Sequence, residues 1–238
     1  MAGLAPDYAF IRIYGVDCNQ TATVTTAARQ HDMQVFAGIF DLSDFPNSLQ
    51  PIIDVGHNND GGWETFHTIA IGNELINKNQ NTIPEVSSAL HTARAKLRAA
   101  GYQGPVVTVD VYSEFLEHPD LCDASDYCAT NCHVFFDATQ TAEKAGGYAR
   151  DVARKISQKS GGKRTVVAES GWPHAGGANG EAVPSERNQR VAVESLRREF
   201  ADAGEELGLV LFTAFDDLWK VDAQGTFGAE KFWGIQRS

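Results

Sequence analysis

The chain has 238 residues, 42% of them hydrophobic, which is enough for one sizeable core and for a single α/β barrel domain. Its formal net charge of -11 repels phosphate backbones, so the composition disfavours nucleic acid as a partner and leaves an uncharged polymer as a suitable one. The chain has no apolar run near the roughly 20 residues that span a membrane, and residues 1–7 lack the pattern of a secretory signal, as a mature secreted protein also would.

Short apolar runs recur along the chain, and we predict that each is a strand. They are rich in Val, Ile and Phe and carry few charges, which is typical of strands buried on both faces of a parallel sheet. The predicted strands cover residues 9–14, 33–40, 68–72, 106–111, 128–136, 165–169 and 209–215.

Helical patterns separate these runs. The clearest begins at Thr82 as N-cap, has Pro84 in its first turn and ends at Gly101. Three others are predicted over about 21–31, over about 141–157 and from about residue 184. Strands alternate with helices, and the chain contains neither glycine-rich phosphate-loop pattern. It is therefore predicted to form a (β/α)8 TIM-type barrel in one domain, residues 1–238, rather than a dinucleotide fold.

The four cysteines do not have the paired spacing of a structural zinc site. They are Cys18, Cys122, Cys128 and Cys132. Cys128 and Cys132, four apart in a predicted strand, would lie about 13 Å apart, which is too far to share one ion. We expect buried thiols or one disulfide here, and no metal.

Two glutamates stand where predicted strands end. Glu74 follows the run Ile-Ala-Ile-Gly-Asn, and Glu169 ends the run Thr-Val-Val-Ala-Glu. In barrels of this kind the catalytic groups come from the C-terminal ends of the strands. A carboxylate at the end of an apolar strand is poorly hydrated, which is costly unless the group is paired or functional. Either glutamate alone would fit a structural ion pair, but two in matching positions favour a catalytic pair.

Such a pair of carboxyl groups suits the cleavage of a glycosidic bond. One carboxyl is protonated and donates to the leaving oxygen, while the other is ionised and attacks the anomeric carbon. In a retaining enzyme the two carboxyl groups are about 5–5.5 Å apart, and a separation near 9 Å would contradict retention.

The chain resembles glycoside hydrolase family 17 along nearly its whole length. The resemblance is carried by the stretches FIRIYGVDCNQ, IAIGNE, NCHVFFD, VVAESGWP, FTAFDDLWK and EKFWG, and it is strongest to fungal β-1,3-glucanases and β-1,3-glucanosyltransferases. It implies a barrel, retention of configuration, no cofactor and a β-1,3-linked glucan substrate. It also implies that Glu74 is the acid/base, that Glu169 is the nucleophile and that Asn73 hydrogen-bonds the sugar 2-hydroxyl.

Further candidates for substrate binding stand near the same strand ends. Tyr14 is expected to hydrogen-bond the nucleophile or the sugar, or else to be a packed tyrosine. Trp172 is expected to stack on a sugar, or else to be a structural indole. Phe135 and Phe136 are expected to line the cleft or to pack in the core, and His133 is either a site residue or a satisfied core histidine.

The last predicted strand and the residues that follow it contribute three more candidates. In the family this region supplies an acidic residue and a lysine that organise the cleft floor, which here are Asp217, Lys220 and Glu230. Asp110 and Tyr112, at the end of the run Val-Asp-Val-Tyr, are candidates as well. Surface ion pairs are the alternative for the charged ones.

The stretch AFIRIYG matches what is usually the second strand of this family, and only eight residues precede it. The expected barrel therefore lacks its first β/α unit in this chain. Natural shortness, a trimmed N-terminus and closure by another segment all remain open. We expect a monomer without a membrane partner, secreted or in the cell wall, and a dimer if the barrel edge is open.

Three functions compete. The first is a retaining enzyme on β-1,3-glucan, hydrolysing the chain or transferring it to another glucan. The second is a carbohydrate-binding or cell-wall structural protein on a barrel that no longer catalyses, which would not need two carboxylates. The third is an unrelated barrel enzyme such as an aldolase, which would need a lysine at a strand end, and the predicted strands contain none.

Overall fold

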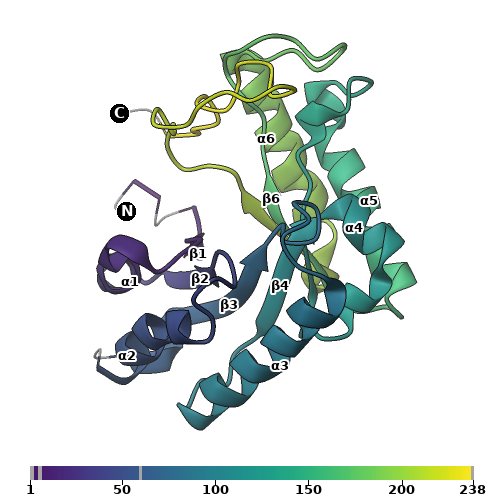
Figure 1. Ribbon diagram of the computed structural model, residues 1–238. Helices are drawn as coiled ribbons and strands as arrows, with labels where there is room; N and C mark the ends of the chain where they lie inside the picture. Colours follow the sequence, from purple (N-terminus) through teal and green to yellow (C-terminus); the bar gives the residue numbers. More distant parts are fainter. Residues whose placement is uncertain (1–2, 5–6, 59–60, 237–238) are drawn as a thin grey trace. The chain divides into compact units, whose positions relative to one another are not determined.

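The computed structural model describes residues 3–4, 7–58 and 61–236 (Figure 1). The chain divides into two compact units, residues 1–128 and residues 129–238. The described residues contain seven strands, the number predicted from the apolar runs, and helices separate most of them.

The first unit is built on four parallel strands that pair in chain order. Ile11 lies opposite Val35, and Ala37 lies opposite Ile69, which in turn lies opposite Val106. The register shifts between Ala70 and Asn73, just before the end of the third strand. The strands are β1 (Phe10–Arg12), β2 (Gln34–Ile39), β3 (Phe66–Asn73) and β4 (Val106–Val111).

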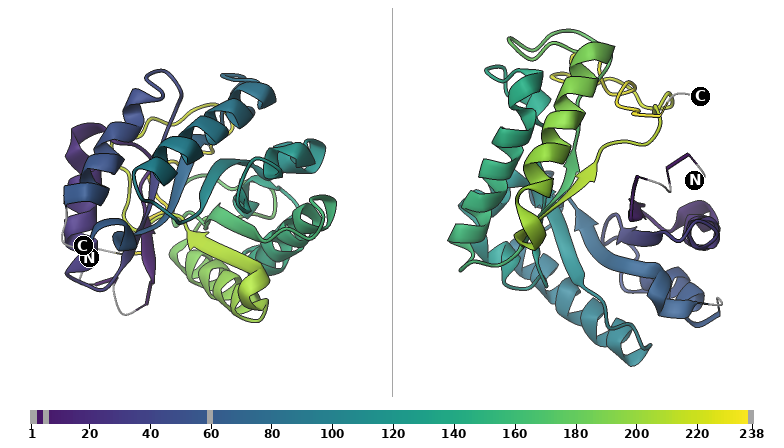
Figure 2. Two further views of the ribbon diagram at one scale, coloured as in Figure 1. Left: turned by 90° about the horizontal axis from the view of Figure 1, so that it is seen from below. Right: turned by 180° about the vertical axis from the view of Figure 1, so that it is seen from behind.

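Helices pack along this sheet (Figures 1 and 2). The predicted helix at Thr82 is confirmed, because the backbone N–H of Thr82 donates to Glu85 Oε2 at 2.7 Å in a capping box. The helices of this unit are α1 (Gln20–Arg29), α2 (Gln50–Asn58), α3 (Ile83–Ala99) and α4 (Tyr112–Glu117). The short 3-10 turns are η1 (Asp17–Asn19), η2 (Asn47–Leu49), η3 (Gly62–Thr65) and η4 (Pro119–Cys122).

Two of these helices, α2 and α4, are absent from the sequence-based prediction. Pro51 and Gly56 in α2 are poor helix formers, but Pro51 stands in the first turn, where its missing N–H costs nothing. Gly56 packs under the indole of Trp63, where a Cβ would collide with the ring. Tertiary packing therefore outweighs the local preference of the sequence in α2.

One disulfide joins Cys122 to Cys128, whereas Cys18 is an exposed thiol and Cys132 a buried one. Cys132 lies beyond β5 (Cys128–Asn131), so the predicted placement of Cys128 and Cys132 in one strand is wrong. The buried residues Val134 and Phe135 extend the apolar run, but they belong to the 3-10 turn η5 (Val134–Phe136).

The second unit pairs β6 (Thr165–Ser170) with β7 (Leu207–Leu211) in parallel, with Thr165 opposite Leu207 and Ser170 opposite Leu211. Every residue of β6 is buried. The last strand ends four residues before the predicted boundary, and Phe212 and Phe215 belong to the segment that follows it.

Helices α5 (Ala145–Lys159) and α6 (Glu186–Ala201) lie side by side in Figures 1 and 2. Gly146 allows their close approach, since a Cβ there would collide with the carbonyl of Ser195. The hydroxyl of Ser185 caps α6 by accepting the N–H of Asn188 at 3.0 Å. The 3-10 turns η6 (Ala142–Lys144) and η7 (Gly204–Glu206) precede α5 and β7.

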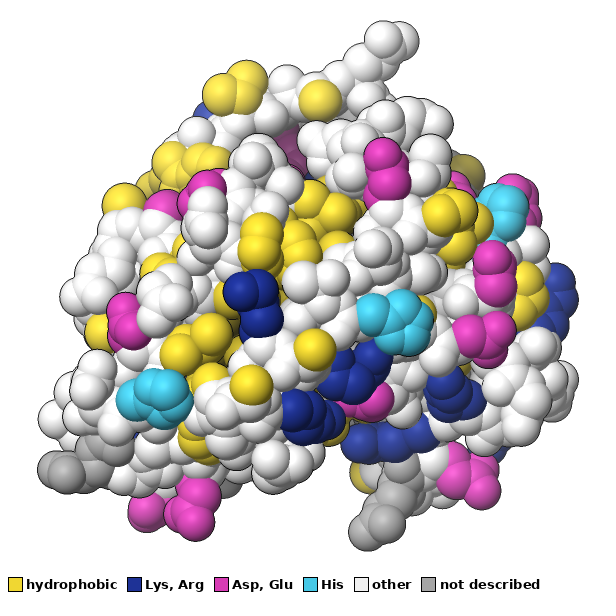
Figure 3. Space-filling view, turned by 60° about the horizontal axis from the view of Figure 1, so that its bottom comes forward, with side chains coloured by type: hydrophobic (Ala, Val, Ile, Leu, Met, Phe, Trp, Pro, Cys, Tyr) yellow, Lys and Arg dark blue, Asp and Glu magenta, His cyan; other side chains and the backbone are white. Residues whose placement is uncertain are grey.

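The face drawn in Figure 3 carries acidic and basic side chains interspersed with hydrophobic ones. Negative charge on that face is therefore distributed rather than gathered in one patch. In the described part of the chain, no helix combines the length and the apolar character that a membrane crossing requires.

Candidate active site

Glu169 is the penultimate residue of β6, and it is only 6% exposed. Its Oε2 lies 3.0 Å from Nε2 of His133, in the loop that follows β5. Burial of a carboxylate is costly unless a polar partner meets it, and His133 supplies one. The sequence left open whether His133 is a core histidine, and the structure places it against the candidate nucleophile.

Aromatic rings surround His133. The rings of Phe212 and Trp233 lie 5.0 and 5.1 Å from the imidazole, centroid to centroid, and that of Phe136 lies 6.2 Å away, all at steep angles. The ring edges confine the imidazole and leave it little freedom to turn. His133 is thus held in the orientation that meets Glu169.

Trp172 does not present a ring face on which a sugar could stack. It is fully buried, its indole N–H donates to the carbonyl of Val183 at 3.0 Å, and its ring packs edge-on against Phe135. The expectation of sugar stacking is therefore corrected to the structural alternative. Phe135 is likewise fully buried and belongs to the core, whereas Phe136 is 41% exposed.

Lys220 gathers the acidic candidates that follow β7. Its Nζ lies 3.2 Å from Asp217 Oδ2 and 3.8 Å from Glu230 Oε2. The same ammonium stands 4.8 Å from the ring centroid of Phe212, one of the rings beside His133. The three residues that were predicted as a group are brought together, and Phe212 connects them to the surroundings of Glu169.

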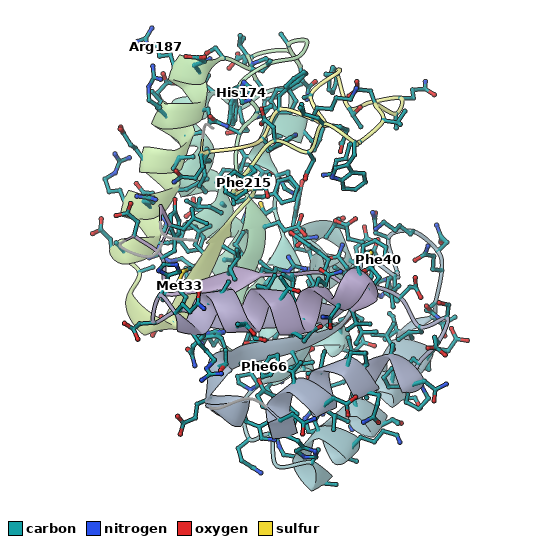
Figure 4. The ribbon with its side chains drawn as sticks, turned by 90° about the vertical axis from the view of Figure 1, so that its left-hand side faces the viewer. Met33, Phe40, Phe66, His174, Arg187 and Phe215 are labelled. Carbon is teal, nitrogen blue, oxygen red and sulfur yellow. A yellow bond between two sulfur atoms is a disulfide. The ribbon has the colours of Figure 1, made fainter. Side chains whose placement is uncertain are left out.

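A second contact in this region was not predicted. His174, just beyond the Ser-Gly-Trp-Pro stretch, has its Nε2 3.0 Å from both carboxylate oxygens of Asp216. Asp216 also accepts the N–H of Gly234 at 2.8 Å. Figure 4 shows His174 beside the C-terminal segment that carries Phe215. These bonds fasten the loop after β6 to the end of the chain.

In the first unit, Glu74 directly follows β3 and its side chain is 19% exposed. Its Oε2 lies 3.3 Å from Nζ of Lys78, and that ammonium stands 4.9 Å from the ring centroid of Phe40. Glu74 has φ 61°, in the left-handed region that a residue with a side chain seldom adopts. Strained backbone of this kind clusters at functional sites.

Asn73 is held by Arg12, whose Nη2 donates to Asn73 Oδ1 at 2.9 Å. Because this hydrogen bond occupies the side-chain oxygen of Asn73, the side-chain NH2 group is the part of Asn73 that donates to other partners. The guanidinium of Arg12 also lies 4.4 Å from the ring centroid of Tyr14, so both predicted residues are organised by one arginine. The sequence analysis did not identify Arg12.

Asp110 and Tyr112 stand at the junction of β4 and α4. Asp110 is 2% exposed and accepts hydrogen bonds from three backbone N–H groups. Burial raises the pKa of the Asp110 carboxyl to about 6, opposed by those hydrogen bonds and aided by the charge of Glu74. Tyr112 is the first residue of α4 and directly follows the strand that was predicted over residues 106–111.

No three His, Cys, Asp or Glu side chains form a group able to hold a metal ion in the part of the chain that the structure describes.

The family model of the BtgE/BtgC glycoside hydrolase domain matches residues 1–234. The chain belongs to this family. The match confirms the glycoside hydrolase family that the motifs around Glu74 and Glu169 indicated.

Curated relatives of this BtgE/BtgC glycoside hydrolase domain include a cell surface mannoprotein and probable family 17 glucosidases of yeasts. Cell surface mannoprotein MP65 of Candida albicans is 41% identical over 226 residues, which cover 94% of this chain and 57% of that protein. The probable family 17 glucosidase SCW4 of Saccharomyces cerevisiae is 40% identical over 233 residues, which cover 96% and 57%. The chain spans little more than half the length of these relatives.

A solved structure with the same fold as this BtgE/BtgC domain is the family 17 β-1,3-glucanosyltransferase from Rhizomucor miehei. It matches with a TM-score of 0.83 at 22% identity, covering 98% of this chain and 83% of that one. An active-site mutant of that enzyme has been solved in complex with laminaritriose. At this identity the likeness establishes the fold alone, and it confirms the predicted TIM-type barrel.

Proposed function

We propose that this chain is the catalytic domain of a retaining glycosidase that acts on β-1,3-glucan. The observation that carries the proposal is that two glutamates stand at the C-terminal ends of β3 and β6, each with a dedicated basic partner. Lys78 lies against Glu74, and His133 lies against Glu169. The family match and the laminaritriose bound by the Rhizomucor miehei enzyme support the choice of reaction and substrate.

In the first step, a carboxylate oxygen of Glu169 attacks the anomeric carbon of the glucan and forms a covalent glycosyl ester. The bond to the leaving oxygen breaks, and the protonated carboxyl of Glu74 gives its proton to that oxygen. Glu169 suits this role because it is the more buried of the two and is oriented by His133.

In the second step, Glu74 takes a proton from an acceptor hydroxyl, whose oxygen attacks the anomeric carbon and releases Glu169. Two inversions give net retention. Water as acceptor makes the enzyme an endo-β-1,3-glucanase, and the hydroxyl of another glucan chain makes it a β-1,3-glucanosyltransferase. The transferase named among the structural neighbours favours transfer.

Asn73, through its amide N–H, is placed to bind the sugar 2-hydroxyl, a contact that strengthens in the transition state. Arg12 orients it by occupying its oxygen. Tyr14 and Phe136 are further proposed substrate contacts, whereas Asp217, Lys220 and Glu230 organise the surroundings of the nucleophile. The cell-surface naming of one relative supports a secreted or wall-bound location.

The test is a time course with laminari-oligosaccharides, followed by chromatography. Shorter products alone indicate hydrolysis, and products longer than the substrate indicate transfer. Glu169→Ala should abolish both, and azide should then restore turnover by forming a glycosyl azide of inverted configuration. Glu194→Gln, on the exposed surface of α6, is the control and should leave activity unchanged. A folded wild-type protein that binds these sugars without converting them would establish the non-catalytic alternative instead.

A further inference from the structure

The turn that carries Glu74 has an unusual backbone. Gly72 has φ 85° and Glu74 has φ 61°, with Asn73 between them. The N–H of Glu74 donates to the carbonyl of Val109 in β4 at 2.8 Å. A residue with a side chain keeps a left-handed conformation only where the surrounding structure holds it there. Contacts with neighbouring residues therefore have to hold this turn in place.

The side chain of Asp110 accepts hydrogen bonds from the backbone of residues that follow Glu74. Its Oδ2 accepts the N–H of Ile76 at 2.9 Å, and its Oδ1 accepts the N–H of Asn77 at 3.3 Å and that of Val111 at 2.9 Å. One carboxylate thus connects the end of β4 to the two residues that follow the Glu74–Leu75 pair.

Keeping a carboxylate at this position is costly. Asp110 is 2% exposed, and the negative charge of Glu74 lies close enough to oppose its ionisation. Lys78, in the same turn, forms its ion pair with Glu74 at 3.3 Å. A neutral amide of the same shape would avoid the charge, but its NH2 group would face a backbone N–H and leave one of the three donors unsatisfied.

We propose that Asp110 is a positioning residue that fixes the turn bearing Glu74, so that Glu74 can act as the general acid. The proposal rests on the function proposed above. This role replaces the predicted contact between Asp110 and the sugar, because both carboxylate oxygens of Asp110 accept hydrogen bonds from backbone N–H groups.

The experiment compares kcat/KM for two substrates that differ in their need for an acid. A laminari-oligosaccharide has a poor leaving group and needs protonation, whereas a 2,4-dinitrophenyl β-laminaribioside does not. We expect Asp110→Asn to lower kcat/KM about 10- to 100-fold on the oligosaccharide and less than about 3-fold on the aryl substrate, because only general-acid assistance is lost. A structural defect would lower both values equally, and that outcome overturns the proposal.

Asp126→Asn is the matched control. Asp126 also accepts a backbone N–H of β4, from Val106 at 2.7 Å, but it does so at the opposite end of that strand. This variant should change kcat/KM on the two substrates by the same factor. If Glu74→Ala itself shows no preference between the substrates, the proposed acid role fails. If Glu74→Ala shows it and Asp110→Asn does not, the positioning role alone fails.

Hydrogen exchange on the wild-type protein tests the same inference without depending on a variant that folds. The amides of Ile76 and Asn77 should exchange as slowly as those of β4 if Asp110 grips them. Exchange at the rate of an open loop would overturn the proposal.

Discussion

The Nε2 atom of His133 lies 3.0 Å from Oε2 of Glu169, while Nδ1 of the same imidazole is buried with no hydrogen-bond partner among the described residues. A buried polar atom without a partner costs about 1–3 kcal/mol. The rings of Phe212 and Trp233 pack at steep angles against this imidazole and supply apolar surroundings. Stability is therefore given up here to keep a polar group against Glu169, as is common at active sites.

Replacing His133 should separate stability from activity. His133→Phe removes the unsatisfied Nδ1 atom but also takes a hydrogen-bond partner from the buried Glu169 carboxylate, so we expect the free energy of unfolding to change by less than about 1 kcal/mol. Without its orienting contact, Glu169 should lose about 10- to 100-fold in kcat/KM on laminari-oligosaccharides. Denaturant unfolding and steady-state kinetics measure the two effects. His133→Gln keeps a donor and should regain part of the activity, whereas parallel losses of stability and activity in His133→Phe would contradict the role.

The predicted fold depended on apolar runs. These runs predicted where strands lie better than they predicted where each strand begins and ends. The run 106–111 is β4 residue for residue. The runs 128–136 and 209–215 are too long, because buried loop residues such as Phe135 have the composition of strand residues. Hydrophobicity reports burial, and the residues beyond a strand end are buried here by ring packing rather than by sheet pairing.

The predicted site depended on where carboxylates follow strands, and in the structure Glu74 follows β3 while Glu169 stands near the end of β6. Their catalytic roles stay predictions. Their partners were beyond the sequence. Lys78 stands four residues after Glu74, but the segment is a turn and gave no reason to pair them. Arg12 meets Asn73 across 61 positions. Trp172 was misassigned because a motif fixes the order of residues but not the direction in which packing turns a ring.

The pH dependence of stability should reveal Asp110. Its pKa is raised from an ordinary 3.8 to about 6, mainly by burial, so the folded state binds the proton more tightly than the unfolded state does. Its effect on the free energy of unfolding therefore declines as the pH rises from 4 to 7, by at most about 3 kcal/mol. Asp110→Asn should remove this decline, measured by urea unfolding at several pH values. An identical slope in both proteins would show that Asp110 ionises normally.

A pair of glycine substitutions should have opposite effects on stability. A Cβ at Gly171, two residues after Glu169, would collide with the backbone carbonyl of Phe212, which cannot yield as a flexible side chain can. We expect Gly171→Ala to lower the free energy of unfolding by about 1–3 kcal/mol and to reduce activity by displacing the end of β6. Gly147→Ala is the control, since nothing lies within 4 Å of its added Cβ and the position is helical. It should raise stability by about 0.5–1 kcal/mol.

Trp219 should determine how much of the reaction is transfer. It follows β7 and is 78% exposed, while the adjacent Lys220 is fixed by Asp217 and Glu230. The exposed indole offers a ring face on which an acceptor glucan of the proposed reaction can stack, and such a contact is worth about 1 kcal/mol. Under the proposed function, Trp219→Ala should lower the ratio of lengthened to shortened products about 5-fold while total substrate consumption changes less than about 2-fold. Val221→Ala, at an apolar position of the same segment that is 86% exposed, should leave the ratio unaltered. If both variants shift the ratio alike, the effect belongs to the segment and not to the indole.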